Sequence, residues 1–104
     1  MSVDVDDVTF ARISKALADP QRCEILQRMA TTGELCCSDI VQKCAVSQAT
    51  ISHHLKELAT AGLLERRKEG QFGYYSFQPK LMAAYVEELK RRMGLTNARS
   101  GKGR

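Results

Sequence analysis

The chain has 104 residues, of which 43% are hydrophobic and 27% are charged. This length and balance fit one small globular domain and exclude a chain that is disordered throughout. Sixteen Lys and Arg against twelve Asp and Glu give a net charge of +4, which favours a polyanionic partner.

The sequence predicts neither a membrane-spanning segment nor a secretory signal. No apolar run reaches the roughly 18 residues that indicate a transmembrane helix. Residues 1–7 carry Asp4, Asp6 and Asp7, whereas a secretory signal begins with basic residues and an apolar stretch. We therefore expect a cytoplasmic protein with no membrane partner.

Two helices are predicted at the start of the chain. Apolar residues recur every three or four positions between residues 8 and 17, which predicts a helix with one buried face. The residues on that face are Phe10, Ile13, Ala16 and Leu17. Asp19 then supplies an N-cap and Pro20 a first helical residue for a second helix, which we expect to run to about Ala30. Its inward residues are Cys23, Leu26, Met29 and Ala30.

A third and a fourth helix are predicted after a short apolar stretch at residues 35–37. Ser38 and Ser47 are suitable N-caps for them, and Gly62 ends the fourth. A three-residue link, residues 45–47, joins the two helices. This arrangement fits a helix-turn-helix whose second member enters the major groove of DNA.

The outward face of the fourth helix is small and polar, opposite the apolar face of Ile51, Leu55 and Leu58. Side chains of this kind reach phosphates, base edges and thymine methyl groups. An ordinary amphipathic surface helix carries the same residues, so this element alone leaves DNA binding undecided. The residues of this helix that we expect to contact DNA are Gln48, Ala49, Thr50, Ser52, His53 and Lys56.

The segment after Gly62 favours DNA binding. Residues 63–68 and 74–77 are two strand-like runs around a glycine-containing turn, which predicts a β-hairpin. A basic hairpin directly after a helix-turn-helix forms a wing that lies along the DNA backbone or enters the minor groove. The wing residues that we expect to contact DNA are Arg67, Lys68 and Gln71.

A fifth helix is predicted over Pro79–Met93, and its apolar stripe is wide for so small a core. This stripe either packs within the chain or pairs in part with a second subunit. Residues 94–104 hold three basic residues and no acid, so they carry +3 and residues 1–93 carry +1. We expect residues 1–93 to form one winged helix-turn-helix domain and residues 94–104 to form a flexible basic tail.

Several segments, in order, resemble the ArsR/SmtB family of bacterial winged-helix repressors over roughly residues 10–90. These segments are Ala16–Arg22, Gly33–Cys36, Ser47–Leu58, Ala61–Leu64 and Arg67–Gly70 ahead of Tyr74 and Tyr75. The resemblance implies a mainly α fold with a small β-hairpin, and a homodimer formed through the first and last helices. It also implies a repressor that binds an inverted repeat in double-stranded DNA and is released by an inducer. The expected dimer residues are Phe10, Ile13, Leu81, Tyr85 and Leu89.

Four cysteines bear on which inducer is expected. Arsenic-responsive members of the family carry a Cys-x-Cys after Glu-Leu; Cys36 matches its first position, whereas Ser38 stands at its second. Thiophilic ions such as As(III) and Sb(III) bind three thiolates. The thiolates available for such a site are Cys36 and Cys37 with either Cys44 or Cys23. The alternatives are a redox or sulfur-reactive switch and cysteines that only pack, although Cys36 has no obvious core role.

Other site chemistries are disfavoured. Glu87 and Glu88 on the last helix lack a His partner for zinc, and the adjacent His53 and His54 point about 100° apart on a helix. We expect His54 to make a structural hydrogen bond and Arg22 to form a buried pair. Because no catalytic or phosphate-binding motif is present, we expect no enzyme and no obligatory cofactor. The alternative from another class is an architectural DNA-binding or interaction module without an inducer.

Overall fold

The computed structural model describes residues 4–36, 39–40, 42, 46–70 and 72–95. Four helices and three strands have bounds within these residues. The helices are α1 (Asp7–Leu17), α2 (Pro20–Thr32), α4 (Gln48–Thr60) and α5 (Pro79–Arg92). The strands are β1 (Leu35–Cys36), β2 (Leu64–Glu69) and β3 (Phe72–Phe77). In this part of the chain, no helix combines the length and the apolar character needed to cross a bilayer.

The predicted caps fix the starts of two helices. The Asp19 carboxylate accepts hydrogen bonds from the backbone N–H groups of Gln21 at 2.8 Å and Arg22 at 3.2 Å, and α2 follows it. The Ser47 hydroxyl accepts from the backbone N–H of Thr50 at 3.2 Å, and α4 follows it. Both caps satisfy N–H groups that the first turn of a helix leaves without a partner.

The third predicted helix is seen only in part. Asp39, Ile40 and Gln42 are helical, and the other positions of this helix lie outside the described residues. Four helices rather than the expected five therefore have defined bounds in the part of the chain that the structure describes. Of the predicted tail, only Gly94 and Leu95 fall within that part, so the domain boundary stays a prediction.

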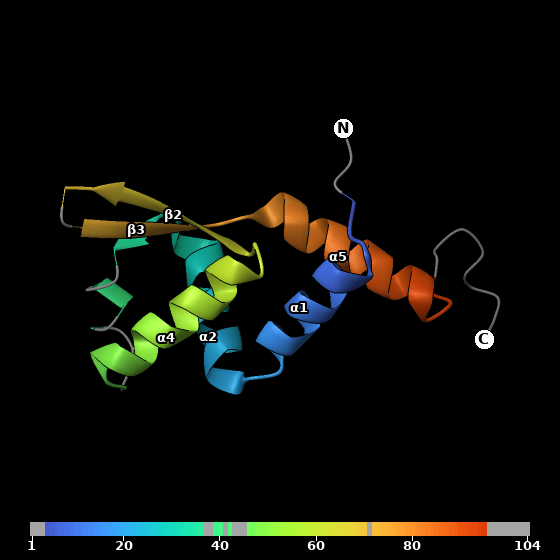
Figure 1. The fold of residues 1–104 in the computed structure, drawn as a ribbon, viewed down its shortest axis with the longest axis horizontal. Helices are drawn as coiled ribbons and strands as arrows, with labels where there is room; N and C mark the ends of the chain where they lie inside the picture. Colours follow the sequence, from blue (N-terminus) through green and yellow to red (C-terminus); the bar gives the residue numbers. More distant parts are fainter. Residues whose placement is uncertain (1–3, 37–38, 41, 43–45, 71, 96–104) are drawn as a thin grey trace.

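The predicted hairpin is present and belongs to a three-stranded antiparallel sheet of order β1-β3-β2. The first strand of this sheet comes from the short apolar stretch, where Leu35 pairs with Tyr75 and Cys36 with Tyr74. In Figure 1 the sheet runs along one side of the helices, and the hairpin turn and the start of α4 lie at the same end of the long axis. The two predicted DNA-contacting elements therefore share one end of the molecule.

The core lies between the helices and one face of the sheet. Its largest fully buried side chains are Ile13, Met29, Ile40, Ile51, Leu55, Leu58 and Leu63. Gly62 ends α4 with φ +88°, and a Cβ added there would lie 2.9 Å from Leu81 Cδ2. The turn into β2 therefore requires glycine, both for its backbone conformation and for the close approach of α5.

Two of the expected dimer residues, Ile13 of α1 and Tyr85 of α5, are buried within the chain. The ring of Phe10 stacks on that of Tyr85 with centroids 5.0 Å apart, and the Tyr85 hydroxyl lies 2.8 Å from Ser14 Oγ. Tyr85 is 7% exposed and Ile13 is fully buried. Both residues are thus buried within one chain and offer almost no area to a second subunit.

Candidate nucleic-acid interface

The outer face of α4 presents the predicted base-reading residues to solvent. Its exposed positions are Gln48, Ala49, Ser52, His53 and Lys56. Thr50 is half-buried, and its hydroxyl accepts a hydrogen bond from the Ser47 hydroxyl at 3.0 Å. The opposite face, with Ile51, Leu55 and Leu58, is completely buried. The burial of one face therefore fixes which residues α4 turns outward.

A buried histidine holds α4 against α2. His54, 5% exposed, has Nε2 3.0 Å from Gln21 Oε1, and its Nδ1 lies 3.5 Å from Arg22 Nη1. The structural hydrogen bond expected for His54 is thus confirmed. Within the described part of the chain, Arg22 makes hydrogen bonds in place of the expected buried pair, and its Nε donates to the Ala16 carbonyl at the end of α1 at 2.9 Å.

The strand register divides the hairpin side chains between two faces. Side chains alternate along a strand and directly paired residues share a face, so Leu64, Arg66 and Lys68 lie together with Gly73 and Tyr75. Leu64 and Tyr75 are buried, which makes this the face that meets the helices. Arg66 and Lys68 are exposed and continue it toward the hairpin turn. We call this pair of cations the inner wing face.

The opposite, outer wing face holds Arg67 among carboxylates. Its guanidinium donates to both Glu34 oxygens, at 3.0 and 2.9 Å, and to Glu69 Oε1 at 2.6 Å, and it lies over the Tyr74 ring at 4.8 Å. The hydrogen bonds to Glu34 and Glu69 raise the pKa of Arg67, and the hydrogen bond from Arg67 lowers the pKa of Glu34. The group expected to be open to phosphate is already engaged.

The charge of Arg67, which the sequence predicts to contact DNA, is used within the protein. Arg66, a basic residue of the predicted wing that is not among the expected contacts, shares a face with Lys68 because side chains alternate along the strand. Gln71, also predicted to contact DNA, lies outside the described residues.

The predicted thiolate site is only partly described. Cys36 lies in β1, is 8% exposed, and its backbone N–H donates to Asp39 Oδ2 at 3.3 Å. This burial corrects the expectation that Cys36 lacks a core role. Cys37 and Cys44 lie outside the described residues. Among the residues that the structure does describe, no group of three His, Cys, Asp or Glu is placed to hold a metal ion.

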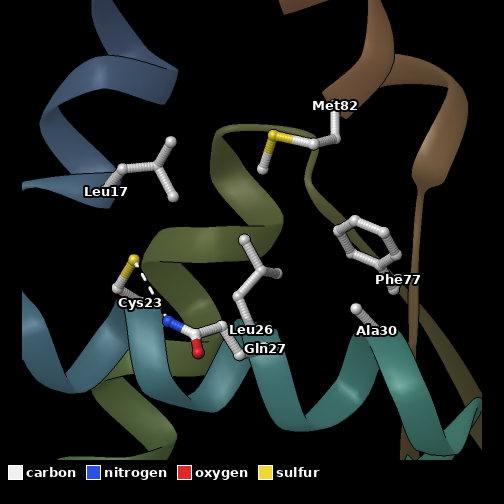
Figure 2. A pocket seen from close by; sticks show the side chains of 7 residues that line it. All are labelled: Leu17, Cys23, Leu26, Gln27, Ala30, Phe77 and Met82. Atoms are coloured by element: carbon white, nitrogen blue, oxygen red, sulfur yellow. Dashed lines mark hydrogen bonds between the residues drawn. The ribbon is translucent and has the colours of Figure 1, made fainter. Parts of the chain in front are cut away.

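The fourth cysteine, Cys23, lies apart from Cys36. It stands in the first turn of α2, and β1 begins only after the far end of this helix, which at about 1.5 Å per residue is about 13 Å away. Its Sγ accepts a weak hydrogen bond from Gln27 Nε2 at 3.9 Å (Figure 2). The thiol borders an apolar cavity of about 240 Å³. The other lining residues are Leu17, Leu26, Gln27, Ala30, Phe77 and Met82. Cys23 therefore lies too far from Cys36 to share an ion with it.

Known sequences that match this chain belong to bacterial transcriptional regulators. The family described as "Bacterial regulatory protein, arsR family" matches residues 19–66. An uncharacterized HTH-type transcriptional regulator of Methanocaldococcus jannaschii is 43% identical over 65 residues, which cover 62% of this chain and 73% of that protein. An arsenical resistance operon repressor of Staphylococcus aureus is 34% identical over 80 residues, 77% of this chain and 76% of that protein. The Staphylococcus aureus cadmium resistance transcriptional regulatory protein CadC homolog is 38% identical over 78 residues; these span 75% of this chain but 64% of that protein.

Solved structures have the same architecture. An ArsR-like transcriptional regulator from Rhodococcus superposes with a TM-score of 0.75 at 26% identity, over 84% of this chain and 81% of that chain. A homodimeric winged helix-turn-helix DNA-binding domain from Mycobacterium bovis gives a TM-score of 0.66 at 30% identity, over 80% of this chain and 83% of that chain. The matched proteins are named as transcriptional regulators, in agreement with the expectation that this chain is not an enzyme.

Proposed function

Because the chain belongs to the arsR family of bacterial regulatory proteins, we propose that it is a repressor that binds an inverted-repeat operator as a homodimer and leaves it when a thiophilic inducer binds. The observation that carries this proposal is that two exposed elements lie at one end of the molecule. The start of α4 and the hairpin of β2 and β3, whose β2 carries Arg66 and Lys68, share this end (Figure 1).

The two surfaces divide the work of DNA recognition. The start of α4 enters the major groove, where Gln48, Ser52 and His53 reach base edges and Ala49 meets a thymine methyl group. Lys56 and the inner wing face contact phosphates, which fix the register of the protein on the duplex without reading its sequence. Thr50 is hydrogen-bonded to the Ser47 N-cap, so it stabilises the start of α4 and also contacts DNA.

A second subunit supplies the second reading helix. The homodimeric Mycobacterium bovis domain supports this assembly. On this chain, Val8 of α1 and Val86 of α5 are 62% and 42% exposed, and Met93 follows α5 at 61%. Phe10 of α1 and Leu81 and Leu89 of α5 are partly buried and pack against the core. A twofold axis through this surface matches the symmetry of an inverted repeat.

The inducer is As(III) or Sb(III), bound by Cys36 and Cys37 with Cys44. Relatives named for arsenical resistance support this ion class, and three thiolates are the donors that it prefers. Because Cys36 is buried, its thiolate becomes available only when β1 shifts. Binding of the ion and binding of DNA then oppose each other with one coupling free energy.

The test is a mobility-shift titration on the DNA upstream of the gene that encodes this chain, with As(III), Sb(III), Cd(II), Zn(II), peroxide and persulfide in parallel. We expect a sequence-specific complex that As(III) and Sb(III) dissociate. Equal affinity for an unrelated duplex would instead support an architectural module. Release by peroxide or persulfide alone would support a redox or sulfur-responsive switch.

Cys36→Ser and Cys23→Ser form a matched pair for the same assay. Cys36→Ser should keep its affinity for the operator and lose release by As(III), because the ion then lacks one of three ligands. Cys23→Ser should keep both properties, since Cys23 lies at the other end of α2. Release that persists in Cys36→Ser would refute the proposed site.

A further inference from the structure

One ion pair crosses the whole sheet. Glu34 directly precedes β1 at one edge, and Arg67 lies in β2 at the other edge. Arg67 binds both oxygens of Glu34 and passes over Tyr74, which belongs to the central strand β3. Two strand spacings of about 4.8 Å separate the edges, a distance that only a long side chain spans. We call the Glu34–Arg67 pair the strap.

The strap joins two parts of the fold that have few other links. β1 consists of two residues, Leu35 and Cys36, and therefore contributes only two residue pairs to the sheet. The hairpin beyond Leu64 is exposed along β2. A bidentate pair between a carboxylate and a guanidinium has a fixed planar geometry, so it restrains both partners in angle as well as in distance.

The charges around Arg67 argue against a second role as a phosphate contact. The outer wing face carries Glu65 and Glu69, and two carboxylates, those of Glu34 and Glu69, bind the guanidinium of Arg67. A DNA phosphate at this place would have to compete with these carboxylates for Arg67, and their negative charges would repel it. The inner wing face, in contrast, presents Arg66 and Lys68.

We propose that Glu34 is a positioning residue for the wing: it holds Arg67, and with it the hairpin, to β1 in the orientation in which the inner wing face meets DNA. This inference rests on the proposed DNA-binding function. The strap contributes by pre-organisation, because a wing that is already oriented loses less conformational freedom when the complex forms. It also ties the wing to the strand that carries Cys36.

The test compares Glu34→Gln, Arg67→Gln and the double variant by fluorescence anisotropy on the upstream duplex over a range of KCl concentrations. Both single variants should bind about two- to fivefold more weakly, the range expected for a half-exposed ion pair, and the double variant should bind no more weakly than either. The dependence of log K on log salt should keep its wild-type slope, since the protein still neutralises the same phosphates. Glu65→Gln is the matched control, because it removes the same charge from the same face outside the strap, and it should not weaken binding.

Two results would overturn the strap. If Arg67→Gln flattens the salt dependence by roughly 0.9, the change expected when one phosphate is no longer neutralised, Arg67 binds phosphate directly. If Glu34→Gln and Glu65→Gln bind the upstream duplex with the same affinity, the Glu34–Arg67 pair has no positioning role. Amide hydrogen exchange of the free protein separates the strap from the proposed function. Glu34→Gln, but not Glu65→Gln, should speed amide exchange in β2 and β3, and this result does not depend on DNA binding. Failure of the wild-type chain to bind any duplex would refute the proposed function and leave this test of the strap intact.

Discussion

The partners of His54 determine its protonation state. An arginine has only donors, so His54 Nδ1 must accept from Arg22, and the ring proton resides on Nε2, where it is donated to Gln21 Oε1. Burial lowers the pKa of His54, and the charge of Arg22 lowers it further, against an opposing contribution from Asp19. The neutral imidazole is therefore part of the packing of α2 against α4.

His54 should make the fold sensitive to mild acid. The pKa in the unfolded chain is near 6.5 and the pKa in the folded protein is lower, so the unfolded state binds more protons as the pH falls. The stability that neutral His54 confers is present above pH 6.5 and is lost on acidification below it. We expect the free energy of unfolding, measured with urea, to fall between pH 7.5 and pH 5.5.

His54→Gln tests this assignment, and His53→Gln is its control. His54→Gln should cost about 1–3 kcal/mol at pH 7.5, because it disturbs a buried hydrogen-bonded group, and should weaken the pH dependence. His53 is exposed on α4, so His53→Gln should retain the wild-type profile. An unchanged profile in His54→Gln would contradict the assignment.

At the scale of elements, local signals predicted the helix and the hairpin that carry the candidate site. The spacing of Ile51, Leu55 and Leu58 determines the outward face of α4, and Ser47 determines where the helix begins; both signals lie within a few residues of the structure they specify. The hairpin was likewise predictable, because its two strands are adjacent in sequence and Gly70 turns between them with a positive φ.

The parts that sequence reasoning missed depend on distant partners. A strand of two residues has almost no pattern of its own, and β1 exists because Leu35 and Cys36 pair with β3 nearly forty positions later. Arg67 looks like a free cation in the sequence because Glu34 is 33 residues away. The burial of Cys36 likewise follows from the sheet and not from its neighbours.

The inner wing face gives a prediction at this scale. Lys68→Gln and Arg66→Gln should weaken binding to every duplex alike and flatten the salt dependence by roughly 0.9 for each phosphate that the variant no longer neutralises. Lys90→Gln is the control, because Lys90 lies in the last turn of α5, at the end of the molecule away from the hairpin (Figure 1). Anisotropy titrations at several KCl concentrations measure the slopes. An unaltered slope in Lys68→Gln would remove the inner wing face from the interface.

At the scale of the whole molecule, several side-chain contacts join α1 and α5. Arg92 donates to Asp7 at 2.7 Å and lies 4.1 Å from the centroid of the Phe10 ring, which in turn stacks on Tyr85. These contacts fix the two helices to each other within one chain. Val8 of α1 and Val86 of α5 are exposed apolar residues on these two helices, and the contacts between the helices fix their positions within one chain.

Val86→Glu should prevent the proposed dimer without unfolding the chain. Val86 is 42% exposed, so a carboxylate there is solvated in the monomer but would be buried in a dimer that uses this surface. Tyr85 is unsuitable for this test because its burial makes loss of folding the expected result. In sedimentation, Val86→Glu should have the monomer mass of 11.6 kDa, whereas the wild-type chain should have twice that mass. The operator affinity of Val86→Glu should fall by at least about tenfold, because a single reading helix then binds alone. Lys80→Gln changes the charge by the same amount about 120° around α5 and should remain dimeric. A Val86→Glu dimer that still binds the operator would place the subunit contact elsewhere.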